Sequence, residues 1–170
     1  MKRNAPNQRP VISLGLSPVL VTVELLAAMA ILLAVLLILQ FWAVLPDRIP
    51  IHFGDRGLAD AWGDKVTIWI MPAVAAIIFA VLTAVSRYPH TFNYPVPITS
   101  ENARRQYLLG RGLLVWLKAE ICWLLAFVVR QQILVALGNA QRFSIELLLG
   151  IIVLVLGTVC VYLFKAYSAR

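Results

Sequence analysis

The sequence predicts an all-α integral membrane protein with four transmembrane helices and with both termini in the cytoplasm. The chain has 170 residues, of which 61% are hydrophobic and only 14% are charged, whereas a soluble domain is about 45–50% apolar and about 25% charged. The apolar residues gather in four windows, each close to the length of about 20 residues that crosses a bilayer as a helix. The net charge of +7 comes from segments on one side of these windows.

The four windows set the organisation of the chain. They cover residues 19–39, 66–85, 113–129 and 147–164. The second and the last contain no charged residue, the first contains Glu24, and the third contains Lys118 and Glu120. We therefore expect a cytoplasmic basic tail at 1–17, a two-span membrane domain at 18–110, and a long third helix and a fourth helix within 101–170. The two-span domain holds an outer loop at 45–65 and an inner loop at 86–100.

The placement of charge predicts the orientation, because cytoplasmic loops carry an excess of Lys and Arg. If the spans alternate, the N-terminal tail, the connection between the second and third spans and the C-terminus share one side. These segments hold the basic surplus: Lys2, Arg3, Arg9, Arg87, Arg104, Arg105, Arg111, Lys165 and Arg170. No basic stripe with interleaved exposed aromatics remains outside the spans. We therefore expect a lipid bilayer, and not nucleic acid, as the partner of the basic residues.

Local signals mark the ends of the helices. Ser17 followed by Pro18 fits an N-cap and a first helical position, where proline's missing donor costs nothing. The inner loop contains three prolines and is expected to be non-helical. Ser100 is the expected N-cap of the third helix, and Gly138 is its expected C-terminal stop.

Small residues in two spans predict where helices approach closely. They repeat every fourth residue in the second span and seven residues apart in the fourth, at Ala76, Ala80, Ala84, Gly150 and Gly157. Both spacings place small side chains on one helix face. We expect these faces to be helix contacts.

The outer loop has the composition of an ordered cap. Two prolines and three glycines restrict its backbone, with a short extended stretch at 49–53 ahead of a turn at 54–57. The loop contains the pattern LPxxIPxHF, then a glycine four residues after the phenylalanine, then DxWGxK. These positions are Leu45, Pro46, Ile49, Pro50, His52, Phe53, Gly57, Asp60, Trp62, Gly63 and Lys65.

A second motif follows the second span, where a proline-rich segment ahead of a helix start contains Pro89, Phe92, Asn93 and Pro95. Together the two motifs resemble a bacterial membrane domain of unknown function that is found at the N-terminus of SdpI-type immunity proteins. The resemblance implies a multi-pass protein of the bacterial inner membrane. In some relatives such proteins are linked to resisting a secreted toxin or to signalling its presence.

Three ionisable residues inside the spans are functional candidates, because charges within a membrane are costly. Glu24 and Lys118 lie at matching depth when measured at 1.5 Å per residue from the inner ends of their helices, so we expect an ion pair between the first and third spans. Glu120 is two residues from Lys118, hence on another helix face. It is left without an evident counter-charge, and a role in relaying protons or contacting a solute is the alternative for all three.

The outer loop offers two kinds of site. Its histidine and aspartates could hold a cation, but we favour a role in turns, caps and internal hydrogen bonds for His52, Asp55, Asp60 and Asp64. His52, Phe53 and Trp62 together would present an aromatic surface, which suits a peptide or a polar lipid better than a metal. No metal or other cofactor is expected, and no enzyme motif such as HExxH, GxSxG or a P-loop is present in the sequence.

These observations predict a non-enzymatic membrane protein that acts as an accessory, immunity or sensing component through its extracytoplasmic loop. The expected partner is a peptide toxin or another membrane protein. One alternative is a small transporter or proton-coupled subunit that uses Glu24, Lys118 and Glu120. A second alternative is a structural subunit of a membrane complex.

Overall fold

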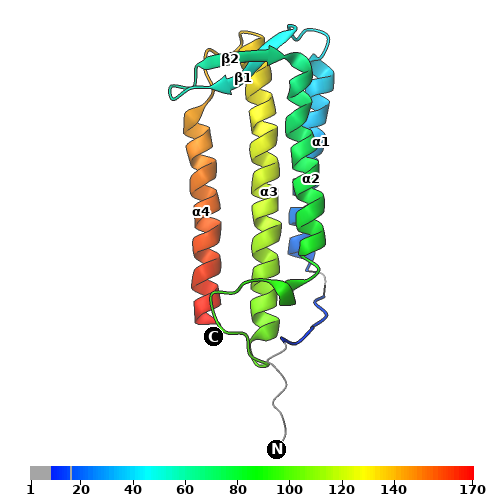
Figure 1. The fold of residues 1–170 in the computed structure, drawn as a ribbon, viewed down its shortest axis with the longest axis vertical. Coiled ribbons are helices and arrows are strands. Elements are labelled where there is room, and N and C mark those ends of the chain that lie inside the picture. Colours follow the sequence, from blue (N-terminus) through cyan, green and yellow to red (C-terminus); the bar gives the residue numbers. More distant parts are fainter. Residues whose placement is uncertain (1–8, 16) are drawn as a thin grey trace, which may run out of the picture.

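The computed structural model describes residues 9–15 and 17–170; Lys2 and Arg3 of the predicted basic tail lie outside this range. The described chain forms four long helices, α1 (Pro18–Phe41), α2 (Ile70–Val85), α3 (Ala103–Ala136) and α4 (Ile145–Ser168). Each is long and apolar enough to cross a membrane, α2 together with the 3₁₀ helix η1 (Lys65–Trp69) ahead of it. Figure 1 shows the helices side by side, with a small sheet at one end. The prediction of four such helices is confirmed.

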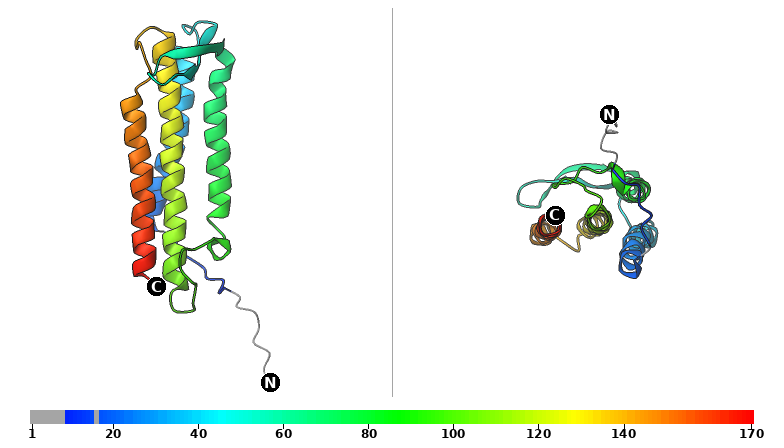
Figure 2. Two further views of the ribbon diagram at one scale, coloured as in Figure 1. Left: turned by 60° about the vertical axis from the view of Figure 1, so that its left-hand side comes forward. Right: turned by 90° about the horizontal axis from the view of Figure 1, so that it is seen from below.

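Helix α3 lies at the centre of the bundle. It packs against α1, α2 and α4, and the view along the bundle places α4 beside α3 at the edge, away from α1 (Figure 2). No residue in the apolar window of α4 is buried in the protein, whereas 39% of the residues in the α3 window are. Helix α4 therefore leaves more of its residues open to lipid or to a partner than α3 does.

The closest helix contact uses small residues that the sequence analysis did not select. Ala27, Ala30 and Ala34 of α1 are fully or almost fully buried, and their spacing of three to four residues places them on one face. They share a core cluster with Ala119 and Cys122 of α3. Small side chains let two helix backbones approach closely, which explains why α1 and α3 form the main seam of the bundle.

The predicted small-residue contacts on α2 and α4 are wrong. Ala76, Ala80 and Ala84 are exposed, and a Cβ added at Gly150 or Gly157 would meet no atom within 4 Å. Helix α2 turns another face toward α3, with Ala75 buried, and Gly157 of α4 lies beside an open groove and not in a tight helix contact.

The outer loop contains a β-hairpin, so the chain is not all-α. Strand β1 (Arg48–Phe53) pairs antiparallel with β2 (Ala59–Asp64), and the register shifts around His52 as in a β-bulge. The extended stretch at 49–53 and the turn after it were predicted, but the second strand was not. Its residues, ADAWGD, are mostly poor strand formers. Pairing with β1 therefore depends on the turn and on packing against the helices.

Two helix boundaries illustrate the role of caps. Helix α3 begins at Ala103 with Asn102 as its N-cap, three residues later than predicted from Ser100. The turn ahead of it is closed by two bonds: the Thr99 amide donates to the Asn102 side chain at 2.9 Å, and the Asn102 amide donates to the Thr99 hydroxyl at 3.3 Å. The helix ends as predicted before Gly138, whose φ of +74° suits a residue without Cβ. The inner loop includes one short 3₁₀ helix, η2 (Pro89–Thr91).

Candidate functional site

The outer hairpin is fastened to the bundle by the inward-facing part of its motif. Leu45 and Ile49 are buried in the main core cluster. Pro50 is also fully buried, and its carbonyl accepts a hydrogen bond of 3.1 Å from Nε2 of Gln132, near the outer end of α3. These motif positions therefore serve to attach the hairpin to α3.

A second attachment joins the hairpin to the connection between α3 and α4. The ring of Phe53 lies 5.0 Å from that of Phe143, which in turn lies 5.3 Å from Phe127 of α3. The Phe143 amide donates to the carbonyl of Gly57 at 2.7 Å. Gly57 has a φ of +74°, and a Cβ at this position would lie 2.5 Å from the Phe143 carbonyl oxygen. The motif requires glycine here for its backbone conformation and for this close approach.

The remaining motif positions order the base of the hairpin. Lys65 pairs with Asp47 at 3.3 Å and lies over the ring of Trp42, and the Asp64 side chain caps η1 by accepting from the Val66 amide at 2.8 Å. Pro46 is exposed. A Cβ added at Gly63 would lie 2.9 Å from the Ile51 side chain, so glycine gives Ile51 its space there. No cluster of three or more potential metal ligands exists within residues 9–15 and 17–170.

The hairpin exposes a polar pair and two large apolar side chains. His52 Nδ1 lies 2.6 Å from Asp60 Oδ1, and both side chains are more than half exposed. Ile51 is 47% exposed and Trp62 is 44% exposed. Phe53, expected on the same surface, instead packs inward against Phe143. Ile51, His52, Asp60 and Trp62 are thus exposed; Ile51 lies beside Gly63 and so on the other side of β2 from Trp62, and we call these four exposed side chains together the outer face.

The predicted ion pair between Glu24 and Lys118 is present. Lys118 Nζ donates to Glu24 Oε2 and, at 2.7 Å, to the hydroxyl of Thr83 on α2. The Lys118 side chain is 0% exposed, and its ammonium lies 4.5 Å from the centre of the Phe79 ring. A single cation thus links α1, α2 and α3 at one depth. Thr83 was missed, although a hydroxyl within a wholly apolar span is a signal for such a partner.

Glu120 lies elsewhere, on the side of α3 that faces α4. Its Oε1 accepts a hydrogen bond of 2.5 Å from Thr158 of α4. Its Oε2 is buried and has no partner among the described residues. The expectation that Glu120 lacks a counter-charge agrees with this arrangement, and Thr158 is a second hydroxyl partner that the sequence analysis missed.

Comparison with known proteins bears on the outer hairpin. Residues 29–76 match the family described as Domain of unknown function (DUF1648), and these residues run from the middle of α1 through the hairpin into α2. The chain contains a DUF1648 domain. The match supports the resemblance drawn from the loop motif; it does not reach the second motif or the three intramembrane charges.

One relative is similar to part of this chain. An uncharacterized protein of Archaeoglobus fulgidus is 35% identical over 82 residues, which cover 41% of this chain and 45% of that protein. The match therefore spans less than half the length of the relative. No solved structure matches the chain.

The second motif lies at the end of the bundle opposite the hairpin, outside the matched residues, and docks on α3. Tyr94 donates to the carbonyl of Pro89 at 2.8 Å, and its ring packs between those of Phe92 and Tyr107. A Cβ at Gly110 would lie 3.0 Å from the Tyr94 ring, so glycine permits this contact. Burial raises the pKa of the Tyr94 hydroxyl. Within the motif itself Pro89 is buried and Asn93 is exposed, with Phe92 and Pro95 intermediate.

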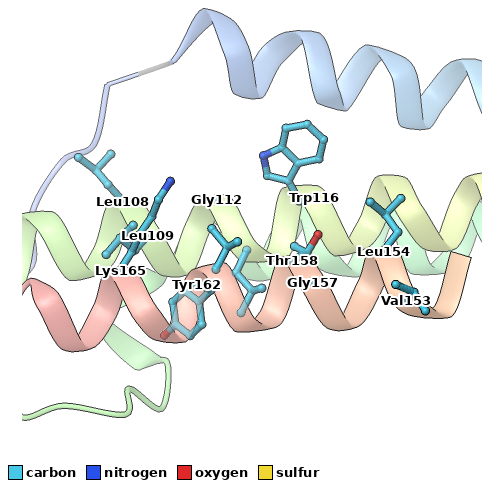
Figure 3. A pocket seen from close by; sticks show the side chains of 12 residues that line it. Leu108, Leu109, Gly112, Trp116, Val153, Leu154, Gly157, Thr158, Tyr162 and Lys165 are labelled. Carbon is cyan, nitrogen blue, oxygen red and sulfur yellow. The ribbon is translucent and has the colours of Figure 1, made fainter. Parts of the chain in front are cut away.

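Two hollows accompany these sites. A polar cavity of about 210 Å³ lies between the inner ends of α1, α2 and α3 and reaches Glu24, with Arg87 and Arg111 among its lining residues. A larger groove of about 690 Å³ runs between α3 and α4. Figure 3 shows its lining side chains spread along both helices, from Val153 at one end to Lys165 at the other.

The inner end of that groove is held together by a residue that the sequence analysis missed. Nε2 of Gln106, which is fully buried, donates to the carbonyls of Ala166 and Ala169 at 2.9 and 3.0 Å. These bonds give partners to carbonyls at the C-terminal end of α4, where the last carbonyls have few partners within the helix; the Ala166 carbonyl also accepts from the Ala169 amide at 3.3 Å. Gln106 thereby fixes α4 against α3.

Proposed function

We propose that this chain is a non-enzymatic, multi-pass protein of the bacterial plasma membrane that recognises a partner through the outer face of its DUF1648 hairpin. The partner is a peptide, such as a secreted toxin, or another membrane protein. The observation that carries the proposal is the division of the motif into two sets of residues. One set attaches the hairpin to α3 and to the α3–α4 connection, and the other leaves apolar and polar groups exposed on an ordered support.

The chemistry of the outer face suits such a partner. Ile51 and Trp62 are large, half-exposed apolar side chains, and Trp is among the residues that most often dominate binding energy at interfaces. The exposed His52 and Asp60 pair adds hydrogen-bonding groups to the same hairpin. A rigid support lowers the entropy lost on binding. The contacts that attach the hairpin to α3 and to the α3–α4 connection provide that support.

The proposed orientation places the hairpin outside the cell and both termini in the cytoplasm. The end of α4 and the start of α1 lie at the end of the bundle opposite the hairpin (Figure 1). Arg87, Arg104, Arg105 and Lys165 belong to that same end, in agreement with the excess of basic residues in cytoplasmic segments.

Site-specific photo-cross-linking in membranes of the host tests the proposal. A photoreactive amino acid is placed at position 62, at position 51 and, as a control, at position 81, where Val81 is 53% exposed on the apolar surface of α2. We expect a discrete protein or peptide adduct at 62 and 51 and lipid adducts alone at 81. The adduct at 51 should be lost in W62A. Lipid adducts alone at all three positions would refute recognition through the outer face.

One observation favours transport as a second candidate function. The polar cavity near Arg87 and Arg111 reaches Glu24 from the inner end of the bundle, and Glu120 holds a buried oxygen without a partner in the described chain. Proteoliposomes that enclose a pH-sensitive dye distinguish the two candidates. Proton flux that is lost in E120Q and retained in W62A supports transport, whereas flux no greater than that of empty liposomes excludes it.

A further inference from the structure

The groove between α3 and α4 is apolar along its length and cationic at one end. Its walls are formed mostly by leucine, valine and glycine, together with Trp116, Thr158 and Tyr162, and no acidic residue lines it. Lys165 lines its inner end. Arg105 precedes Leu109 by four residues on α3 and so lies on the same helix face, one turn nearer that end. Both cationic side chains are exposed, and neither forms an ion pair within the described part of the chain.

The length of the groove corresponds to one leaflet of a bilayer. From Val153 to Lys165, α4 rises by about 18 Å at 1.5 Å per residue, and half of the hydrocarbon core is about 15 Å. The cations therefore lie at headgroup depth when the apolar part lies among acyl chains. Gln106 fixes the inner end of α4 against α3, so the position of Lys165 relative to the groove is set by the fold.

We propose that this groove binds one anionic phospholipid of the inner leaflet, with an acyl chain along Leu109, Trp116 and Gly157 and with the phosphate at Lys165 and Arg105. Charge complementarity selects this occupant. A second copy of the chain would bring more basic residues to the same depth, where like charges repel. The assignment to the inner leaflet rests on the proposed orientation, but the site is separate from the outer face, so lipid retention tests it independently of partner recognition.

The absence of side chains at two glycines gives the acyl chain its space. Gly157 of α4 and Gly112 of α3 both line the groove, and a Cβ at either would meet nothing within 4 Å. A larger side chain at Gly157 can therefore fill the groove without a clash in the fold. Gly150, on the same helix and equally open, does not line the groove, and it provides a matched control.

The experiment measures lipid retained by the full chain in nanodiscs and then in detergent, by native mass spectrometry, with phosphatidylglycerol or phosphatidylcholine as the only lipid. We expect one phosphatidylglycerol to stay bound and phosphatidylcholine to be lost. Each basic residue near anionic lipid changes binding about fivefold, so K165Q should weaken retention about fivefold and K165Q/R105Q about 25-fold. R130Q, at the opposite end of α3, should leave retention unchanged.

The glycine variants test the apolar part of the site. G157L should displace the lipid, and G150L should not. Equal retention of both lipids, or equal retention by G157L and G150L, would overturn the proposal. A wild-type dimer that G157L converts to monomer would also overturn it, because the groove would then hold a second copy. If G157L does not fold, the charge variants alone decide the outcome.

Discussion

The buried cation at the centre of the bundle gives the sharpest prediction. We consider K118M, which replaces the lysine by an apolar side chain of similar length. Lys118 is fully buried and bonds to both Glu24 and Thr83. Removing one partner of a buried ion pair costs about 3–5 kcal/mol, because the other charge stays buried without compensation. Glu24 keeps 27% of its side chain exposed and lines the inner polar cavity. We therefore expect the lower end of that range.

The reciprocal variant, E24M, should be more destabilising. It leaves the ammonium of Lys118 with only the Thr83 hydroxyl and the Phe79 ring, and Lys118 has no exposed surface from which to reach water. We expect a loss near the upper end of about 3–5 kcal/mol. The double variant E24M/K118M removes both charges. Because apolar replacement of a whole buried pair is often neutral, its stability should lie within about 1 kcal/mol of wild type, the cost of one unpaired hydroxyl.

The assay is reversible unfolding in mixed detergent and SDS micelles, followed by circular dichroism, for wild type, the two single variants and the double variant. The summed losses of the two single variants should exceed the loss of the double variant by more than about 3 kcal/mol, a non-additivity that identifies direct coupling. R142Q is the control, because Arg142 pairs with Glu146 on the surface with both side chains more than half exposed; no measurable change is expected there. Additive losses would refute the reasoning.

Three further predictions concern the hairpin, the end of α4 and the orientation. G57A should destabilise the hairpin by about 1–2 kcal/mol from the positive φ alone, with the contact to Phe143 adding to it, and faster amide exchange in β1 and β2 measures this. Q106L should reduce the free energy of unfolding by about 1–3 kcal/mol through two lost hydrogen bonds and should expose the end of α4 to protease. Q106E keeps an acceptor but loses the donor, so it should show the same loss as Q106L. In intact cells, an impermeant maleimide should label D55C and not S100C. Labelling of S100C alone would show that the protein has the opposite orientation.

The motif loop shows how far local reasoning extends. The prolines and glycines of residues 45–65 predicted an ordered cap, an extended stretch and a turn, all of which are present. The second strand was not predicted, because Ala59–Asp64 has little strand propensity of its own and pairs through long-range contacts. For the same reason Phe53 was assigned to the surface. Its partner Phe143 lies far along the chain, and no local pattern connects the two.

The intramembrane residues show the same limit. Equal depth along two helices was enough to predict the Glu24–Lys118 pair, because depth follows from residue number in a regular helix. Thr83 and Thr158 were not predicted as partners. Depth alone does not specify rotation about the helix axis, and the rotation decides which side chains meet.

The sequence by itself determined the four helices, their lengths and the sidedness of charge. A membrane-spanning helix satisfies its backbone hydrogen bonds within its own segment, so hydropathy and length are sufficient to define it. Only the tertiary structure decided that α1 and not α2 supplies the small-residue seam, that α4 lies at the edge beside a groove, and that one lysine joins three helices. Lipid is as apolar as the surface of these helices, so it does not determine which face of a helix turns toward the bundle. The helix contacts therefore depend on the fit between helices that are distant in the chain.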